Sequence, residues 1–310
     1  MESRVTYPLA RQRPREETTV TETTDQATSR ADDTTGLRGF MNQGGFWRYL
    51  LFLVAYLAVY LCSGLALGEL APDLAGADLL SSVGAVFVQV TFGLVVGGVV
   101  LFAMAHYLGW TRDLFGPQPI YRSRWMWIGP VVALVPVALR VLGIDWGRNS
   151  LAVVAMVLLS GLLVGVVEEL MYRGFAVRMV RSGGHGERAV AALAALAFAL
   201  SHSVNLLSGQ AVTTVALTVV YTFGFGVLMY LTLRVTGFLV WAMLVHGLTD
   251  PTTILASGGI DKVASGGSTS GLLSVAGLFT VPLALVGIVA LLFVRGRVGE
   301  PGPDGKHVPA

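Results

Sequence analysis

The feature that most constrains the fold is a succession of apolar segments, each close to the length that crosses a membrane. A helix needs about 20 apolar residues to span the ~30 Å hydrocarbon core of a bilayer. Only 13% of the residues are charged, whereas a soluble globular chain averages about 25%. The sequence therefore predicts an all-α, polytopic membrane protein. Its transmembrane helices, about eight in number, are expected at residues 47–67, 83–108, 125–142, 152–172, 189–204, 211–233, 238–255 and 272–294.

The two ends of the chain differ in composition from this apolar region. Residues 1–45 are rich in Thr, Arg, Glu and Asp and lack apolar periodicity, which predicts a disordered cytosolic tail. Residues 295–310 combine Gly, Pro and charged residues and are predicted to form a second disordered cytosolic tail. No apolar segment precedes Phe46, so no signal peptide is expected. The transmembrane domain is thus expected at residues 46–294.

Basic residues predict the orientation of the helices, because cytoplasmic loops carry an excess of Arg and Lys. Every second connection contains such residues, and the alternate connections contain few. An even number of spans places both termini on one side, which we expect to be the cytosolic side of the cell membrane. The residues that support this orientation are Arg112, Arg122, Arg124, Arg178, Arg181, Arg188, Arg234, Arg295, Arg297 and Lys306.

Other compositional features narrow the class further. No basic cluster is dense enough to follow a phosphate backbone, so no nucleic-acid partner is expected. The single cysteine, Cys62, cannot form an intrachain disulfide and is expected to serve packing. Few lysines beside many arginines, with abundant Ala, Val and Gly, favour a bacterial source with a GC-rich genome.

The fourth apolar segment contains two adjacent carboxylates, Glu168 and Glu169, followed by Arg173. An ionisable residue at membrane depth is costly and is by default a functional-site hypothesis. Glu169 and Arg173 are four residues apart, so the two side chains can pair on one helix face. Glu168 points about 100° away from Glu169 on a 3.6-residue helix. We therefore expect one glutamate to be held by arginine while the other faces a cavity.

Two histidines complete the set of ionisable side chains within the spans. The fourth and fifth segments form a hairpin with its tip at the glycine pair 183–184, and Glu168 and His202 lie at similar chain distances from this tip. Helical arms would therefore bring both side chains to a similar depth. His246 lies at a comparable depth on the seventh segment. The sequence predicts that these three side chains converge if their helices pack together.

Two spacings refine this candidate site. His246 and Asp250 are four residues apart and share one helix face. Phe198 precedes His202 by the same spacing and could wall the same cavity. Each pair alone could be structural, for example a buried ion pair or a helix-to-helix lock. Their joint occurrence at one level favours a site.

Such a set of side chains suits hydrolysis. A carboxylate beside a histidine in an apolar pocket can activate water. Two histidines and a glutamate also form a zinc-type ligand set with an open position for water. Alternatively, the second of these histidines, together with an aspartate, can stabilise charge on a carbonyl oxygen. Peptide-bond hydrolysis is the natural interpretation, with or without a divalent metal such as zinc. The chain has no HExxH motif, which excludes a zincin.

Three short motifs resemble those of the CAAX protease and bacteriocin-processing family (CPBP, also called Abi), which are intramembrane endopeptidases of the type II CAAX prenyl endopeptidase kind. EELMYR at 168–173 resembles the family's EExxxR motif. FALSH at 198–202 is similar to its FxxxH motif, and HGLTD at 246–250 is similar to its HxxxN motif. The motifs occur in order on separate predicted spans, within residues 151–250. The ordered set is more specific than any one motif.

The resemblance implies a role for each matching residue. It implies that Glu168 activates water together with His202. It implies that Glu169 and Arg173 position the catalytic group. The resemblance thus assigns the first two motifs to nucleophile generation.

The third motif would bind the substrate carbonyl through His246 and Asp250. This chain has Asp250 where the family motif has Asn, which leaves open a protonated acid, a contact through His246, or metal coordination. If a metal takes part, the expected ligands are Glu168, His202 and His246.

The predicted function is therefore an intramembrane endopeptidase that hydrolyses a peptide bond of a membrane-associated protein or peptide. Its expected partners are the lipid bilayer and a peptide substrate. Two alternatives remain: a bacteriocin immunity or binding protein without hydrolysis, and a proton-coupled transporter. No inverted repeat supports the transporter, and the intact motifs argue against a non-hydrolytic protein.

Overall fold

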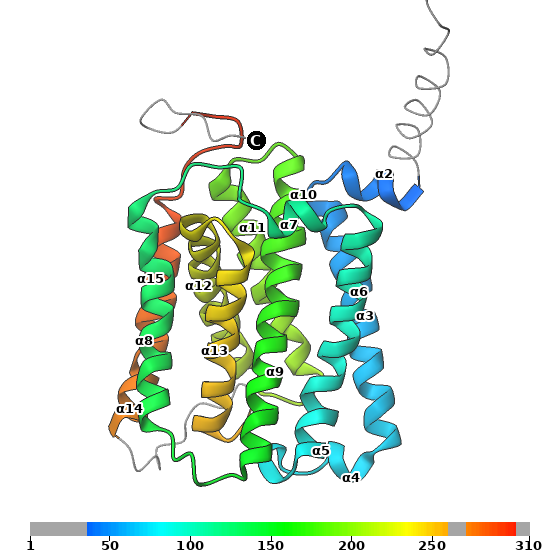
Figure 1. The fold of residues 1–310 in the computed structure, drawn as a ribbon, viewed down its shortest axis with the longest axis vertical. Helices are drawn as coiled ribbons and strands as arrows, with labels where there is room; N and C mark the ends of the chain where they lie inside the picture. The colour runs from blue at the N-terminus through cyan, green and yellow to red at the C-terminus, as the bar shows by residue number, and fades with distance from the viewer. Residues whose placement is uncertain (1–35, 260–270, 302–310) are drawn as a thin grey trace, which may run out of the picture. The chain divides into compact units, whose positions relative to one another are not determined.

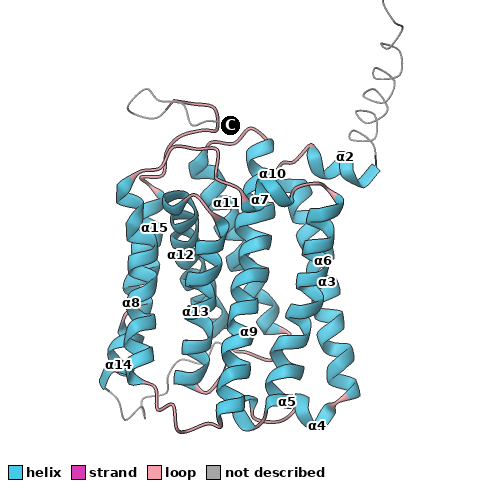
Figure 2. Ribbon diagram, in the orientation of Figure 1, coloured by secondary structure: helices cyan, strands magenta, loops and turns pink. Residues whose placement is uncertain are grey.

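The structure, a computed structural model, describes residues 36–259 and 271–301. In these ranges the regular secondary structure is helical (Figure 2), and eight helical segments are long and apolar enough to cross a membrane. The all-α class and the predicted number of spans are thus confirmed. The candidate spans are Phe46–Leu70, Val83–Tyr107, Arg124–Gly143, Leu151–Ser182, Glu187–Leu206, Val212–Thr236, Leu239–Ser257 and Gly271–Leu291.

Some spans are single helices and others are assembled from consecutive helical pieces. The single helices are α3 (Phe46–Leu70), α12 (Val212–Thr236) and α13 (Leu239–Ser257). The composite spans are α5 (Val83–Val86) with η2 (Phe87–Thr91) and α6 (Phe92–Tyr107); η3 (Arg124–Trp127) with α8 (Ile128–Gly143); α9 (Leu151–Glu169) with η4 (Leu170–Ala176) and α10 (Val177–Ser182); α11 (Glu187–Ser201) with η5 (His202–Leu206); and α14 (Gly271–Leu278) with α15 (Thr280–Leu291). The short helices α4 (Pro72–Ala75), η1 (Leu79–Ser81) and α7 (Thr111–Phe115) lie in connections.

Local sequence signals explain where the site-bearing helices begin and end. Ser150 caps α9, because its hydroxyl accepts a hydrogen bond from the backbone N–H of Val153 at 3.3 Å. Gly237 directly follows α12 and Gly258 directly follows α13, with φ angles of 80° and 81°. Glycine adopts this left-handed conformation without steric cost, so both helices stop at a residue suited to termination.

The fourth span is longer than its sequence prediction of 152–172. The helix continues through the π-helical turn η4 and through α10 to Ser182. The arginines beyond the apolar run are paired, since Arg181 donates two hydrogen bonds to Glu187, each of 2.8 Å, and Arg178 pairs with Asp113. Hydropathy alone ends the span too early because it counts these charges as unpaired.

A buried polar cluster joins the neighbouring ends of α10, α11 and α12. Besides Arg181, Glu187 accepts hydrogen bonds from Arg234 at 3.2 Å and from the Tyr230 hydroxyl. The sequence prediction placed Arg234 in a loop, but Arg234 lies within α12 and is buried. The carboxylate of Glu187 supplies the opposite charge that allows an arginine inside this helix.

Close contact between α9 and α13 forms the centre of the bundle (Figure 1). Gly161 and Gly165 lie one turn apart on α9 and face Pro251 and Gly247 of α13. A Cβ atom built on Gly165 would lie 2.2 Å from the carbonyl oxygen of Met243. Small residues at this spacing allow the backbones of two membrane helices to touch. The register that they impose continues along α9 to Glu169, four residues after Gly165.

The two ends of the bundle are marked by the chain path and by tryptophans. Helix α3 begins and α15 ends at the same end, whereas α4 and α5 lie at the opposite end (Figure 1). Exposed tryptophans lie in the first turns of spans and next to the end of α8, as expected of side chains at a membrane–water interface. They are Trp47, Trp125, Trp127, Trp146 and Trp241.

The segments predicted to be tails are only partly described. Residues 1–35 and 302–310 lie outside the described residues. Helix α2 (Gly36–Asn42) falls within the predicted tail 1–45 and belongs to a unit separate from residues 43–310. Residues 295–301 contain no helix.

Candidate active site

The ion pair predicted between Glu169 and Arg173 is present and fully buried. The Nη1 atom of Arg173 donates to Oε1 of Glu169 at 2.8 Å, and both side chains are 0% exposed. The Nη2 atom of Arg173 donates to the backbone carbonyl of Gly226 on α12 at 2.9 Å. Arg173 therefore fixes the carboxylate of Glu169 and ties the fourth span to the sixth.

His246 contacts the same carboxylate oxygen from the other side. Its Nδ1 lies 2.7 Å from Oε1 of Glu169. Because a carboxylate oxygen accepts, Nδ1 carries the proton and donates it. The opposite nitrogen, Nε2, lies 3.7 Å from Oε2 of Glu168 and 3.6 Å from Oδ2 of Asp250. Glu169 thus fixes which edge of the imidazole faces Glu168 and Asp250.

The adjacent glutamates have different environments, as their helical spacing predicts. The side chain of Glu168 is 29% exposed, whereas that of Glu169 is 0% exposed. Asp250 lies on the same face as His246, and its side chain is 34% exposed. Glu168 and Asp250 are therefore the two carboxylates of the set that have accessible surface.

His202 lies where α11 gives way to η5. Its Nδ1 donates a hydrogen bond to the carbonyl of Phe198 at 2.9 Å, so Nε2 is the nitrogen free to accept or carry a further proton. The ring of Phe198 contacts both His202 and His246, and His246 lies beside Glu168. The predicted convergence of Glu168, His202 and His246 from three helices is present in the structure.

Aromatic rings fill the space between the two histidines. The Phe198 ring centroid lies 4.9 Å from that of His202 and 5.8 Å from that of His246. The guanidinium of Arg173 lies 4.7 Å above the same ring. Phe225 of α12 contacts His246 with centroids 4.9 Å apart. Phe198 was expected to wall the site, and the structure places it at the centre of this packing.

Two contributions from α12 escaped the sequence analysis, namely the Phe225 ring and the Gly226 carbonyl. Neither is ionisable, so a search for charged residues within spans passes over both. A signal exists in the segment TFGFG at 222–226, where glycines alternate with an aromatic ring inside a span. A Cβ on Gly226 would lie 3.1 Å from Nη2 of Arg173, so the glycine permits the close approach of the guanidinium.

The three predicted metal ligands do not form a metal site in this conformation. Among the described residues, no group of three or more His, Cys, Asp or Glu side chains is arranged to hold a metal ion. Glu168, His202 and His246 therefore converge without the arrangement of a three-ligand shell.

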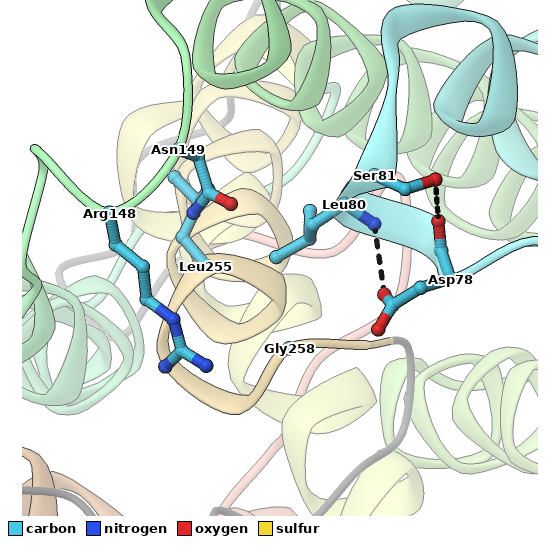
Figure 3. Close-up of a pocket in the computed structure, with 7 residues that line it drawn as sticks. All are labelled: Asp78, Leu80, Ser81, Arg148, Asn149, Leu255 and Gly258. Atoms are coloured by element: carbon cyan, nitrogen blue, oxygen red, sulfur yellow. Dashed lines mark hydrogen bonds between the residues drawn. The ribbon is translucent and has the colours of Figure 1, made fainter.

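A separate pocket lies at the opposite end of α9 (Figure 3). It has a volume of about 220 Å³. Asn149, which precedes α9, lines it, whereas Glu168 lies near the other end of that helix, roughly 25–30 Å away. The pocket is therefore not part of the site around Glu168. It is lined by Asp78, Leu80, Ser81, Arg148, Asn149, Leu255 and Gly258.

Comparison with known proteins identifies the segment that carries this site. Residues 150–252 match a family model described as type II CAAX prenyl endopeptidase Rce1-like. No curated protein matches the chain in a sequence search. The matched segment covers about a third of the chain and includes the six ionisable side chains described above. With the eight candidate spans, it indicates a multi-pass membrane protein in which residues 150–252 form an Rce1-like domain of the type II CAAX prenyl endopeptidase (CPBP, Abi) family.

Proposed function

We propose that this protein is an intramembrane endopeptidase that hydrolyses a peptide bond of a membrane-associated protein or peptide. It resides in the cell membrane with both termini in the cytosol, as the distribution of basic residues indicates. The domain match supports protease activity. The catalytic roles rest on the geometry of the site.

One observation carries the proposal: the partly exposed carboxylate of Glu168 faces His246, whose orientation is fixed by the buried carboxylate of Glu169. Arg173 holds Glu169, Glu169 holds Nδ1 of His246, and Nε2 of His246 faces Glu168. A purely structural ion pair would not need the second, accessible glutamate. A histidine oriented by a buried carboxylate is the arrangement that acid–base catalysis uses to hold an imidazole in one tautomer.

The proposed reaction follows from these positions. Glu168 removes a proton from a water molecule as the water oxygen attacks the carbonyl carbon of the substrate. His202 orients this water through Nε2. The carbonyl oxygen becomes an oxyanion and accepts a hydrogen bond from Nε2–H of His246 in its doubly protonated form. Asp250 acts on this side through its contact with His246. The C–N bond then breaks, and Glu168 returns the proton to the leaving amine.

Glu168→Gln tests the assignment. The amide has nearly the same shape as the carboxylate but cannot remove a proton from water. We expect loss of hydrolysis with unchanged insertion and thermal stability. The wild type and the variant are compared in liposomes that carry a mixture of membrane-anchored peptides, with cleavage products detected by mass spectrometry.

Glu69→Gln is the matched control, because Glu69 is an exposed carboxylate at the end of α3. It should cleave at the wild-type rate. Equal product from folded Glu168→Gln and wild type would contradict the catalytic role. A wild-type protein that cleaves none of the peptides would contradict the proposed activity.

A further inference from the structure

Helix α12 carries none of the ionisable site residues, yet it meets the site at two consecutive residues. The Gly226 carbonyl accepts a hydrogen bond from Arg173. The preceding side chain, Phe225, is 3% exposed and packs on His246. The two contacts therefore reach the two ends of the chain of hydrogen bonds from Arg173 through Glu169 to His246.

The contact between Phe225 and His246 is specific in geometry. The rings meet edge to face, with planes 74° apart. On α12, Tyr221 stacks against Phe225, with centroids 6.1 Å apart and planes 16° apart. The ring centroid of Phe198 on α11 lies 6.4 Å from that of Phe225. Neighbours on two helices therefore hold the Phe225 ring in place.

These contacts close a circuit through three spans. From Gly226 it passes to Arg173, then to Glu169, then to His246, and through the Phe225 ring back to α12. The bond to Cβ and the hydrogen bond from Nδ1 hold the imidazole at two places and leave it able to tilt about the line between them. Contacts on the ring restrict this tilt, and the centroid of Phe225 lies nearer to that of His246 than the centroid of Phe198 does.

We propose that Phe225 is a positioning residue for hydrolysis: its ring holds the imidazole of His246 so that Nδ1 meets Glu169 while Nε2 faces Glu168 and Asp250. The inference deepens the function proposed above and rests on it. Phe225 acts through His246 and touches no reacting atom. Misplacing a reacting group by about 1 Å can cost on the order of 100-fold in rate, so a tilt of the imidazole affects turnover more than binding.

The test is Phe225→Leu, which keeps an apolar side chain but removes the ring. We expect kcat to fall at least roughly tenfold with KM nearly unchanged, and one limb of the pH–rate profile to shift as His246 loses its fixed setting. Phe225→Tyr retains the ring and should recover most of kcat. Phe225→Met is measured instead if the leucine variant does not fold.

Phe175→Leu is the matched control. Phe175 is equally buried, but it packs on Phe52 and Trp110, away from both histidines. It should lose thermal stability to a similar degree while keeping the wild-type kcat and pH profile.

The outcomes separate the two proposals. If Glu168→Gln is inactive while folded Phe225→Leu has the wild-type kcat and pH profile, the positioning role is wrong and the proposed function stands. Equal losses of kcat in Phe225→Leu and Phe175→Leu also overturn the positioning role. If Glu168→Gln remains active, the proposed function itself fails.

Discussion

At the scale of single residues, the neighbouring glutamates Glu168 and Glu169 differ in burial and in contacts although their side chains are identical. Glu169 is enclosed and shared between Arg173 and His246, whereas Glu168 keeps accessible surface. A rotation of about 100° per residue on a helix accounts for the difference. In the proposed function, the buried member, Glu169, organises the site, and the accessible member, Glu168, performs the chemistry. Asp250 extends this pattern as a second accessible carboxylate beside His246.

Removing one partner of the buried pair should be costly. In Arg173→Ala, Glu169 loses its guanidinium partner, which costs about 3–5 kcal/mol for a buried pair. We expect a lower melting temperature in detergent together with loss of hydrolysis. Arg178→Ala is the control on the same span, because its pair with Asp113 is partly exposed and exposed pairs contribute about 0–1 kcal/mol. Equal melting temperatures for the two variants would show that the Arg173 pair is not stabilising.

At the scale of helices, the site depends on the register between α9 and α13. The glycines of α9 bring its backbone against α13, and this contact aligns Glu169 with His246. The helical spacing of Glu169 and Arg173, or of His246 and Asp250, is local and follows from 3.6 residues per turn. The contact between Glu169 and His246 joins residues far apart in the sequence and depends on which faces of the two helices meet.

Gly165→Ala tests this dependence. The added methyl group would overlap the Met243 carbonyl and push the helices apart, and overpacking typically costs about 1–3 kcal/mol. We expect a lower melting temperature and lower activity, because Glu169 and His246 separate. Gly64→Ala on α3 is the control, since no atom lies within 4 Å of its added Cβ. Wild-type activity in Gly165→Ala would mean that the register does not position the site.

A comparison of the predicted and observed helices shows which structural features can be predicted from the sequence. The spans were predictable within a few residues because hydropathy over about 20 residues controls membrane insertion. The end of the fourth span was not, because Arg181 finds its partner Glu187 on the next helix. The pairs at helical spacing were predictable for the local reason given above. The contributions of Phe225 and Gly226 were not, since apolar rings and backbone carbonyls are common in every span.

At the scale of the whole molecule, an even number of candidate spans places the start of α3 and the end of α15 at one end of the bundle (Figure 1). Basic residues on that side predict that it faces the cytosol. The prediction can be tested with single cysteines in a Cys62→Ser background, using Asp73→Cys and Glu300→Cys. Both positions are exposed: Asp73 lies in α4, after the first span, and Glu300 lies after the last span.

A membrane-impermeant maleimide applied to intact expressing cells should label Asp73→Cys. It should label Glu300→Cys only after the membrane is permeabilised. The reverse pattern would invert the proposed orientation and would place the tails outside the cell.

The glycine contact between α9 and α13 also limits how a substrate can travel to Glu168. A Cβ atom on Gly165 would already collide with the Met243 carbonyl at 2.2 Å, so neither a lipid acyl chain nor an extended peptide fits between these two helices. The contact between α9 and α13 is therefore closed to a substrate. A substrate of the proposed reaction would therefore reach Glu168 from the side on which Glu168 and Asp250 have 29% and 34% of their side-chain surface exposed. The small residues that align α9 with α13 therefore also close one side of the site and leave access from the other side.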